Sequence, residues 1–208
     1  MIAIAREDLI RVVIGVDPAV TSGEDADETG IVAVGLGPHQ DQTCRIERCA
    51  GHAYVLEDAT IPRELRPTVD QWAVRVVEAF DLWQADRVIA EGNQGGELVE
   101  QVLRTVRPGL PVKRVTARVG KRTRAEPIAA LYEQGRVHHI GNPLGFSVME
   151  DQLTTWTQSD RESPDRLDAL VWAISALGIS GSTGVLPQMD FVSLPKRNDF
   201  DLGGLTKL

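Results

Sequence analysis

The sequence predicts one α/β domain built on a mixed β-sheet with helices on its faces. Three apolar segments near the start of the chain are separated by loops too short to hold a crossover helix, so they form an antiparallel meander. After residue 68, helical periodicity alternates with short apolar runs, which is typical of parallel βαβ units. With 208 residues and 42% apolar content, the chain is long enough for a single well-buried core.

The three strands of the meander are apolar runs bounded by turn residues. The first spans Arg11–Asp17, and the second spans Thr29–Leu36. Glycine and acidic residues at 21–28 make a loop between them. The third strand is predicted to be longer, from Thr43 to Leu56, with a bend at Gly51.

Both cysteines are expected to be free thiols. Cys44 and Cys49 fall on the predicted third strand five residues apart, so their side chains would point to opposite faces and could not pair. Free thiols are typical of proteins from a reducing cytoplasm.

The parallel part of the sheet is predicted from two helices and two further strands. The first helix opens with capping-box spacing at Thr68 and Gln71, and apolar residues then recur at helical intervals. The strand Arg87–Glu91 and a loop at 92–96 follow, and Leu110–Thr116 is a fifth strand. Between them lies a helix with one apolar side, formed by Leu98, Val99, Val102, Leu103 and Val106.

A last helix is predicted to begin with Ser163 as the N-cap and Pro164 at the first helical position. Asp165 and Asp168 lie about 60° apart on one side of this helix. The same side continues with Ala169, Trp172 and Ala176, and the opposite stripe consists of Leu167, Leu170, Val171, Ile174 and Leu177. Because a solvated face would not carry two alanines and a tryptophan, we expect both sides to be covered and Asp168 to point into a cleft. Asp165 has a simpler alternative, since an acid in the first turn is stabilised by the helix dipole alone.

Three acidic residues occupy positions where functional sites are usually built. Asp17 and Glu91 each close a buried strand, and Asp168 lies near the start of the last helix. Three or four converging carboxylates cannot all ionise without a partner, and oxygen ligands of this kind suit Mg²⁺ or Mn²⁺. The sequence therefore predicts a metal-dependent phosphoryl-transfer site that includes Asp17, Glu91, Asp168 and, as a supporting acid, Asp165.

The net charge of −8 hides a basic segment. Residues 101–125 contain eight Lys and Arg side chains and no acid, so the rest of the chain carries a net charge of −16. Such a block predicts contact with a polyanion, DNA or RNA, although a solvated face is the alternative. The residues expected to hold phosphates are Arg118, Lys121, Arg122 and Arg124.

Two other groups of residues are weaker candidates. Asp25, Asp27 and Glu28 are either outer acids of the metal site or part of a solvated turn. His138 and His139 are neighbours on a strand, so their side chains should point to opposite faces rather than share a metal.

The two ends of the chain differ in character from residues 11–177. Residues 1–10 resemble a linker, and Arg6, Glu7 and Asp8 interrupt the apolar opening that a signal peptide needs. Residues 178–208 mix Pro, Asp and Gly with isolated apolar residues, so we expect a flexible tail there. No apolar stretch approaches the roughly 20 residues that span a bilayer.

Four segments, taken in order, resemble the C-terminal nuclease domain of the large terminase subunits of tailed phages. They are Val16-Asp-Pro-Ala-Val-Thr-Ser-Gly23 with Asp27-Glu-Thr-Gly-Ile-Val32, then Glu91-Gly-Asn-Gln-Gly-Gly96, then Thr123–Val137, and finally Pro164-Asp-Arg-Leu-Asp-Ala-Leu-Val171. The resemblance implies an RNase H-like fold and a metal-dependent endonuclease that cuts concatemeric viral DNA during genome packaging. It places the catalytic acids at Asp17, Glu91 and Asp168, with Asp165 beside them.

The resemblance also implies partners and a setting. These are double-stranded DNA, a portal, a small terminase subunit and an ATPase domain, in the cytoplasm of an infected or lysogenic bacterial host. In a centre with two ions about 3.5–4 Å apart, Asp17 would bridge both ions. Glu91 would complete the ligands of one ion, and Asp168 with Asp165 would complete those of the other.

One feature of large terminases is absent from this sequence. It contains no Gly-x4-Gly-Lys-Ser/Thr phosphate loop, so we expect either an excised nuclease domain, which we favour, or a standalone remnant. Other functions stay open: a Holliday-junction resolvase or transposase of the same fold, a sugar-kinase-like ATPase, or a DNA-binding or motor-docking module without catalysis.

Overall fold

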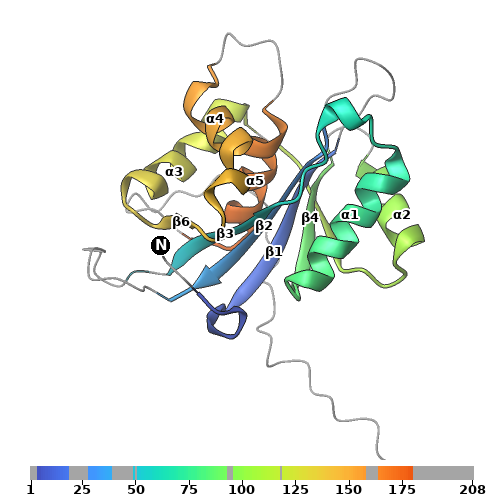
Figure 1. Cartoon of the computed structure of the whole chain (residues 1–208), viewed down its shortest axis with the longest axis horizontal. Coiled ribbons are helices and arrows are strands. Elements are labelled where there is room, and N and C mark those ends of the chain that lie inside the picture. Colours follow the sequence, from blue (N-terminus) through green and yellow to red (C-terminus); the bar gives the residue numbers. More distant parts are fainter. Residues whose placement is uncertain are drawn as a thin grey trace, which may run out of the picture.

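The computed structural model describes residues 4–18, 28–38, 49, 51–92, 96–117, 119–157 and 164–179. They form a six-stranded mixed sheet covered by helices on both faces (Figure 1). The strands are β1 (Arg11–Asp17), β2 (Gly30–Gly37), β3 (His52–Asp58), β4 (Arg87–Glu91), β5 (Val112–Val115) and β6 (Val137–His139). The helices are α1 (Val69–Leu82), α2 (Gly96–Val106), α3 (Lys121–Glu133), α4 (Ser147–Thr155) and α5 (Asp165–Ala176), with short 3₁₀ turns at Arg6–Asp8, Arg63–Leu65 and Pro143–Gly145.

The sheet order is β5-β4-β1-β2-β3-β6. β1, β2 and β3 pair antiparallel, as the predicted meander requires. β4 runs parallel to β1, and β5 runs parallel to β4. β6 adds a parallel strand beside β3 that the predicted series of five strands did not include. The predicted α/β class with a mixed sheet is therefore confirmed.

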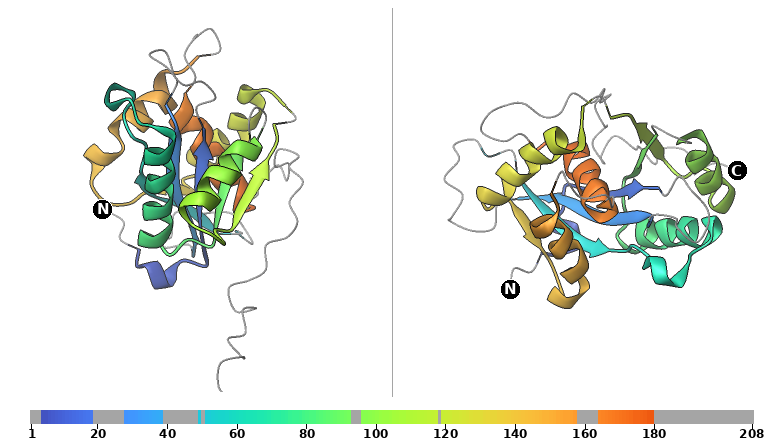
Figure 2. Two further views of the ribbon diagram at one scale, coloured as in Figure 1. Left: turned by 90° about the vertical axis from the view of Figure 1, so that its right-hand side faces the viewer. Right: turned by 90° about the horizontal axis from the view of Figure 1, so that it is seen from above.

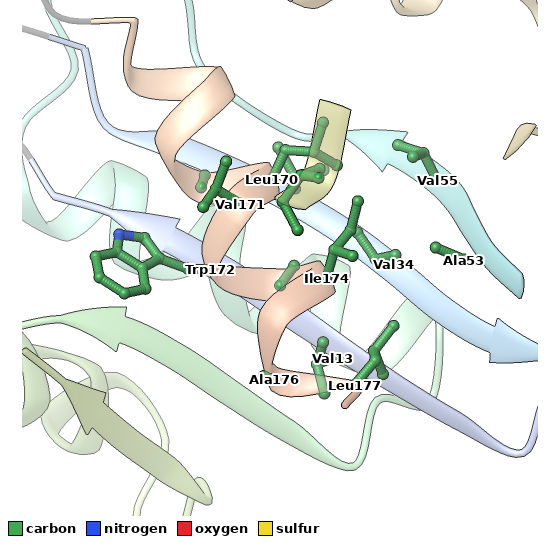
Figure 3. Packing of buried hydrophobic residues seen from close by; sticks show 14 of the residues in the cluster. Val13, Val34, Ala53, Val55, Leu170, Val171, Trp172, Ile174, Ala176 and Leu177 are labelled. Atoms are coloured by element: carbon green, nitrogen blue, oxygen red, sulfur yellow. The ribbon is translucent and has the colours of Figure 1, made fainter. Parts of the chain in front are cut away.

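The central strands are apolar on both faces because each face is covered. On β1, Val13 belongs to the core beneath α5, whereas Val12 and Ile14 belong to the core beneath α1 and α2. Figure 2 shows α1 and α2 on one side of the sheet and α3, α4 and α5 on the other. In Figure 3, Leu170 and Ile174 of α5 lie among the apolar side chains of the strands beneath it.

Helix α5 packs against the sheet at very short range. A Cβ atom built on Gly15 would lie 2.1 Å from the Ala169 carbonyl oxygen, and one built on Gly30 would lie 2.1 Å from that of Asp165. Two glycines facing α5 thus let the helix backbone rest directly on β1 and β2. Every residue of α5 is buried, so the prediction that both of its sides are covered is confirmed.

Several predicted boundaries are wrong. The third strand begins at His52, just after Gly51 with φ of 111°, and Cys49 lies outside it. Cys49 is a free thiol, but the reason is not that it faces away from Cys44 on one strand. Cys44 and most of the predicted strand before Gly51 lie outside the described residues.

The other predicted elements match more closely. Helix α1 has the predicted capping box, in which the Thr68 side chain accepts from the Gln71 backbone N–H. The fifth strand is confined to Val112–Val115, shorter than predicted, and α3 and α4 were not predicted as helices. In α5 the N-cap is Pro164 rather than Ser163, which lies outside the described residues.

Both ends of the described chain contribute to packing. In the segment predicted as linker-like, Leu9 is buried, and the Arg6 guanidinium donates to the backbone carbonyls of Trp83 and Gln84. At the other end, Ile179, two residues after the predicted domain boundary, is fully buried in the core beneath α5. Residues 180–208 lie outside the described part of the chain. None of the helices that the structure describes is both long and apolar enough to cross a bilayer.

Candidate active site

Two of the predicted acids meet at one edge of the sheet. Asp17 is the last residue of β1, and Glu91 is the last residue of its parallel neighbour β4. The register pairs Gly15 with Ile89 and Val16 with Ala90, which sets Asp17 level with Glu91. Because side chains alternate along a strand, both acids point to the face that α5 covers.

Helix α5 brings the other two acids to the same edge. Its first turn lies over the ends of β1 and β2, since Gly30, the register partner of Asp17, touches the backbone of Asp165. Asp165 and Asp168 are 6% and 3% exposed, respectively, so both carboxylates have been removed from water.

The electrostatics of Asp17 show that the four acids act on one another. Burial raises the pKa of Asp17 well above 3.8, and the negative charges of Asp168, Glu91 and Asp165 raise it further. The positive charge of Lys121 works in the opposite direction. The structure thus places all four sequence-predicted acids within one electrostatic cluster.

Asp168 is held by two cations from the start of α3. Lys121 forms an ion pair with its Oδ2, and Arg124 Nη2 donates to its Oδ1 at 3.0 Å. Lys121 and Arg124 are three residues apart, so they share the helix face that meets α5. Asp168 Oδ2 is buried, and the Lys121 ammonium lies directly against it.

Trp172 connects Asp168 to Glu91 through Arg124. The guanidinium of Arg124 lies 4.6 Å from the centre of the Trp172 ring, and the indole Nε1 donates to Glu91 Oε2 at 2.9 Å. In Figure 3, Trp172 points away from the side of α5 that carries Leu170 and Ile174. One aromatic side chain therefore supports acids on two different elements. The helical projection placed Trp172 on the acidic side of its helix, but nothing in the sequence indicated these partners.

The four basic residues expected to hold phosphates have different surroundings. Arg122 is exposed and pairs with Glu126 at 3.1 Å, while Lys121 has a side chain that is 40% exposed. Arg124 is 4% exposed and donates to Asp168, and its expected contact with a phosphate stays a prediction. Helical spacing turns Arg124 towards α5 and Arg122 towards solvent. Arg118 lies outside the described residues.

Of the other candidate acids, Glu28 is the one that the structure describes. Glu28 pairs with Arg166, which also binds Asp58 at 2.9 Å. Asp25 and Asp27 lie outside the described residues.

The two histidines of β6 face different surroundings, as predicted for neighbours on a strand. His138 stacks on His52 and Tyr54. His139 contacts the Tyr132 hydroxyl at 2.8 Å and Glu150 at 2.7 Å.

The donor set suits a divalent cation, although the side chains as placed do not yet form a coordination shell. Among the described residues, no three His, Cys, Asp or Glu side chains are arranged to hold a metal ion. Asp168 faces Lys121 and Arg124 instead, and Glu91 faces Trp172. Yet four acids close enough to raise the pKa of Asp17, with a buried carboxylate oxygen of Asp168 among them, form an environment that a divalent cation would stabilise.

Comparison with known proteins agrees with this geometry. A family model described as the terminase RNaseH-like domain matches residues 14–177. The structure is similar to that of the human cytomegalovirus terminase nuclease domain, Mn-soaked and inhibitor-bound, with a TM-score of 0.52 and 15% identity over 81% of this chain and 84% of that one. A Thermus thermophilus RuvC structure gives a TM-score of 0.40 and 18% identity over 78% of this chain and 90% of that one.

No curated protein sequence matches this chain. The family model, however, covers most of the sequence, including the second half of β1, every later described element up to α5 and all four acids. The structural similarity is consistent with the RNase H-like fold that the resemblance implied. This chain therefore belongs to the family of terminase RNaseH-like domains.

Proposed function

We propose that this chain is a divalent-metal-dependent endodeoxyribonuclease that cuts concatemeric viral DNA during genome packaging. The observation that carries the proposal is the meeting of four carboxylates from β1, β4 and α5 at one sheet edge, close enough to raise the pKa of Asp17. Membership of the terminase RNaseH-like family supports it, as does the use of Mn in the structure of the viral terminase nuclease domain.

The acids would hold Mg²⁺ or Mn²⁺, and we infer two ions. Asp17 is the candidate bridging ligand because the other three acids all act on its charge. Glu91 would complete one position, and Asp168 with Asp165 the other. When bound, such ions activate a water molecule and neutralise the charge that develops on the scissile phosphate.

The protein's own residues prepare this chemistry by fixing the acids. Asp17 and Glu91 are anchored at the ends of paired strands, which limits their freedom. Trp172 orients Glu91 through a hydrogen bond, and Arg124 orients Asp168 in the same way. Lys121 and Arg122 have exposed side chains at the start of α3, where Lys121 pairs with Asp168, so we assign them contacts to DNA phosphates.

The setting of this activity is also a proposal. Packaging would need an ATPase domain in the full-length protein, together with a portal and a small terminase subunit. DNA cleavage and packaging would take place in the cytoplasm of an infected or lysogenic bacterial host.

The direct test is nicking of supercoiled plasmid with Mn²⁺ by the parent and by the Asp17→Asn variant. The substitution preserves volume and removes the charge, so cleavage should fall below detection while the protein stays folded. Asp70→Asn is the matched control, because Asp70 is an exposed acid in the first turn of α1, and it should cut like the parent. Substantial metal-dependent cleavage by Asp17→Asn would show that the site lies elsewhere.

A second arm of the test concerns the substrate. The same protein should be given linear duplex and a four-way junction of matched sequence in Mn²⁺. A packaging nuclease should cut the linear duplex at a comparable rate, whereas strong preference for the junction would indicate a resolvase. Unchanged DNA in both reactions would favour a binding or docking module.

A further inference from the structure

Lys121 and Arg124 both bind Asp168, but they are held very differently. The Arg124 side chain is 5% exposed and has three partners: the Val119 carbonyl at 3.1 Å, the Trp172 ring and Asp168 Oδ1. The Lys121 side chain is 40% exposed and reaches Oδ2 from the surface. Arg124 is thus enclosed by the core, whereas the Lys121 side chain is partly open to solvent.

The contact between Lys121 and Asp168 has the character of a charge pairing. Asp168 Oδ2 is buried, and it forms an ion pair with the Lys121 ammonium. A lysine ammonium is a compact point charge on a flexible stem, unlike the planar fork of arginine. The same positive charge also acts on Asp17, so it affects two of the proposed metal ligands.

We propose that Lys121 is a resident cation of the active site, which occupies Asp168 Oδ2 in the metal-free protein and is displaced when a divalent ion binds. This inference rests on the proposed metal-dependent function. It assigns Lys121 two positions: one on Asp168 before the metal enters, and one in the solvent-facing cleft afterwards, where its charge is available to a DNA phosphate.

The exchange has a physical reason. Four clustered carboxylates repel one another, and a buried carboxylate without a partner is strongly unfavourable. A lysine that leaves as the metal arrives keeps Asp168 paired throughout. Because the two cations compete for one oxygen, the lysine must weaken metal binding by the free energy of the contact that is lost.

The test is metal affinity measured without DNA, by calorimetric titration of Mn²⁺ into the parent and into the Lys121→Gln variant. If Lys121 competes with the metal, Lys121→Gln should bind Mn²⁺ about fivefold more tightly or better, which is the usual size of coupling between two sites. Lys121→Arg keeps the positive charge and should bind Mn²⁺ less tightly than Lys121→Gln does. Arg75→Gln is the matched control, because Arg75 of α1 has a similarly exposed side chain and pairs with Glu57 and Glu78, and its affinity for Mn²⁺ should not change.

Thermal melting gives a second readout that also reports folding. In EDTA, Lys121→Gln should melt below the parent because Asp168 loses a partner. With saturating Mn²⁺ the difference should disappear, since the parent no longer uses the contact either. If the difference in melting temperature between the parent and Lys121→Gln were the same with and without Mn²⁺, the metal would not displace Lys121 and the proposal would be overturned.

The outcomes separate this inference from the proposed function. If the parent binds Mn²⁺, Asp17→Asn does not, and Lys121→Gln binds no more tightly than the parent, the resident-cation role is overturned and the metal site stands. If the parent itself binds no Mn²⁺, both proposals fail.

Discussion

Asp17 is the residue whose ionisation is most affected by its surroundings. Its pKa is raised by burial and by three neighbouring acids, so the folded protein holds this proton to higher pH than the unfolded chain does. In the pH window above 3.8, the folded state therefore binds more protons, and the free energy of unfolding decreases as pH rises.

This decrease in the free energy of unfolding with rising pH gives a prediction for the metal-free protein. Asp17→Asn should melt at a higher temperature than the parent at neutral pH in EDTA, because mutual repulsion among the carboxylates is relieved. The gap between the two melting temperatures should widen as pH rises above 4 and close near pH 4. Parallel melting curves across this pH range would contradict the electrostatic cluster.

How far the sequence predicts the site can be seen by comparing Asp17 with Arg124. Asp17 and Glu91 could be placed at one sheet edge because each ends an apolar strand and parallel strands end together. Arg124 was expected to hold a phosphate because its local sequence is basic. Its burial depends on α3 packing against α5, residues 44 positions away from it in the sequence, and no local pattern reports such a contact.

At the scale of elements, α5 determines whether the site exists. The helix rests on Gly15 and Gly30, and it carries both Asp165 and Asp168. The strands themselves were predictable from their apolar runs, and so was burial of both sides of α5. The close approach of α5 to the sheet was not predictable, since it depends on which glycines of β1 and β2 face the helix.

Gly15→Ala tests this contact. The added methyl group would meet the backbone of Ala169, which cannot rotate away, so α5 must shift. We expect a loss of about 1–3 kcal/mol in unfolding free energy by urea denaturation. Mn²⁺ affinity should fall as well, because the acids of α5 move with the helix.

Gly145→Ala is the control for that experiment, because a Cβ atom there would meet nothing within 4 Å. It should leave both stability and Mn²⁺ affinity close to those of the parent. If Gly15→Ala behaved like this control, close packing of α5 would not be what positions the acids.

At the scale of the whole molecule, an apolar residue beyond the predicted domain boundary is buried in the core. The predicted boundary at residue 177 follows the last apolar residue of the helical stripe. Ile179 lies beyond Gly178, whose φ of 71° ends the helix, yet it is fully buried. A single apolar residue after a glycine carries no periodicity, which is why its burial was not predicted.

Two truncations test the boundary. A chain ending at Ile179 should keep the melting temperature and metal-dependent cleavage of the full chain, because residues 180–208 supply no proposed ligand and no patterned apolar face. A chain ending at Leu177 should lose about 2–4 kcal/mol of stability, the usual cost of removing a buried isoleucine side chain. Equal stability of the two truncated proteins would contradict the packing of Ile179, and a large loss in the longer one would show that the tail is docked.

The central claim is that Asp17, Glu91 and Asp168 form one divalent-metal site. The most direct measurement is a crystal structure after soaking with Mn²⁺, with anomalous diffraction used to locate the ions. We predict anomalous density between Asp17, Glu91 and Asp168, with the Lys121 ammonium moved away from Asp168. The proposed site would be contradicted if Mn²⁺ bound only elsewhere in the protein. It would also be contradicted if no Mn²⁺ bound and Lys121 stayed paired with Asp168.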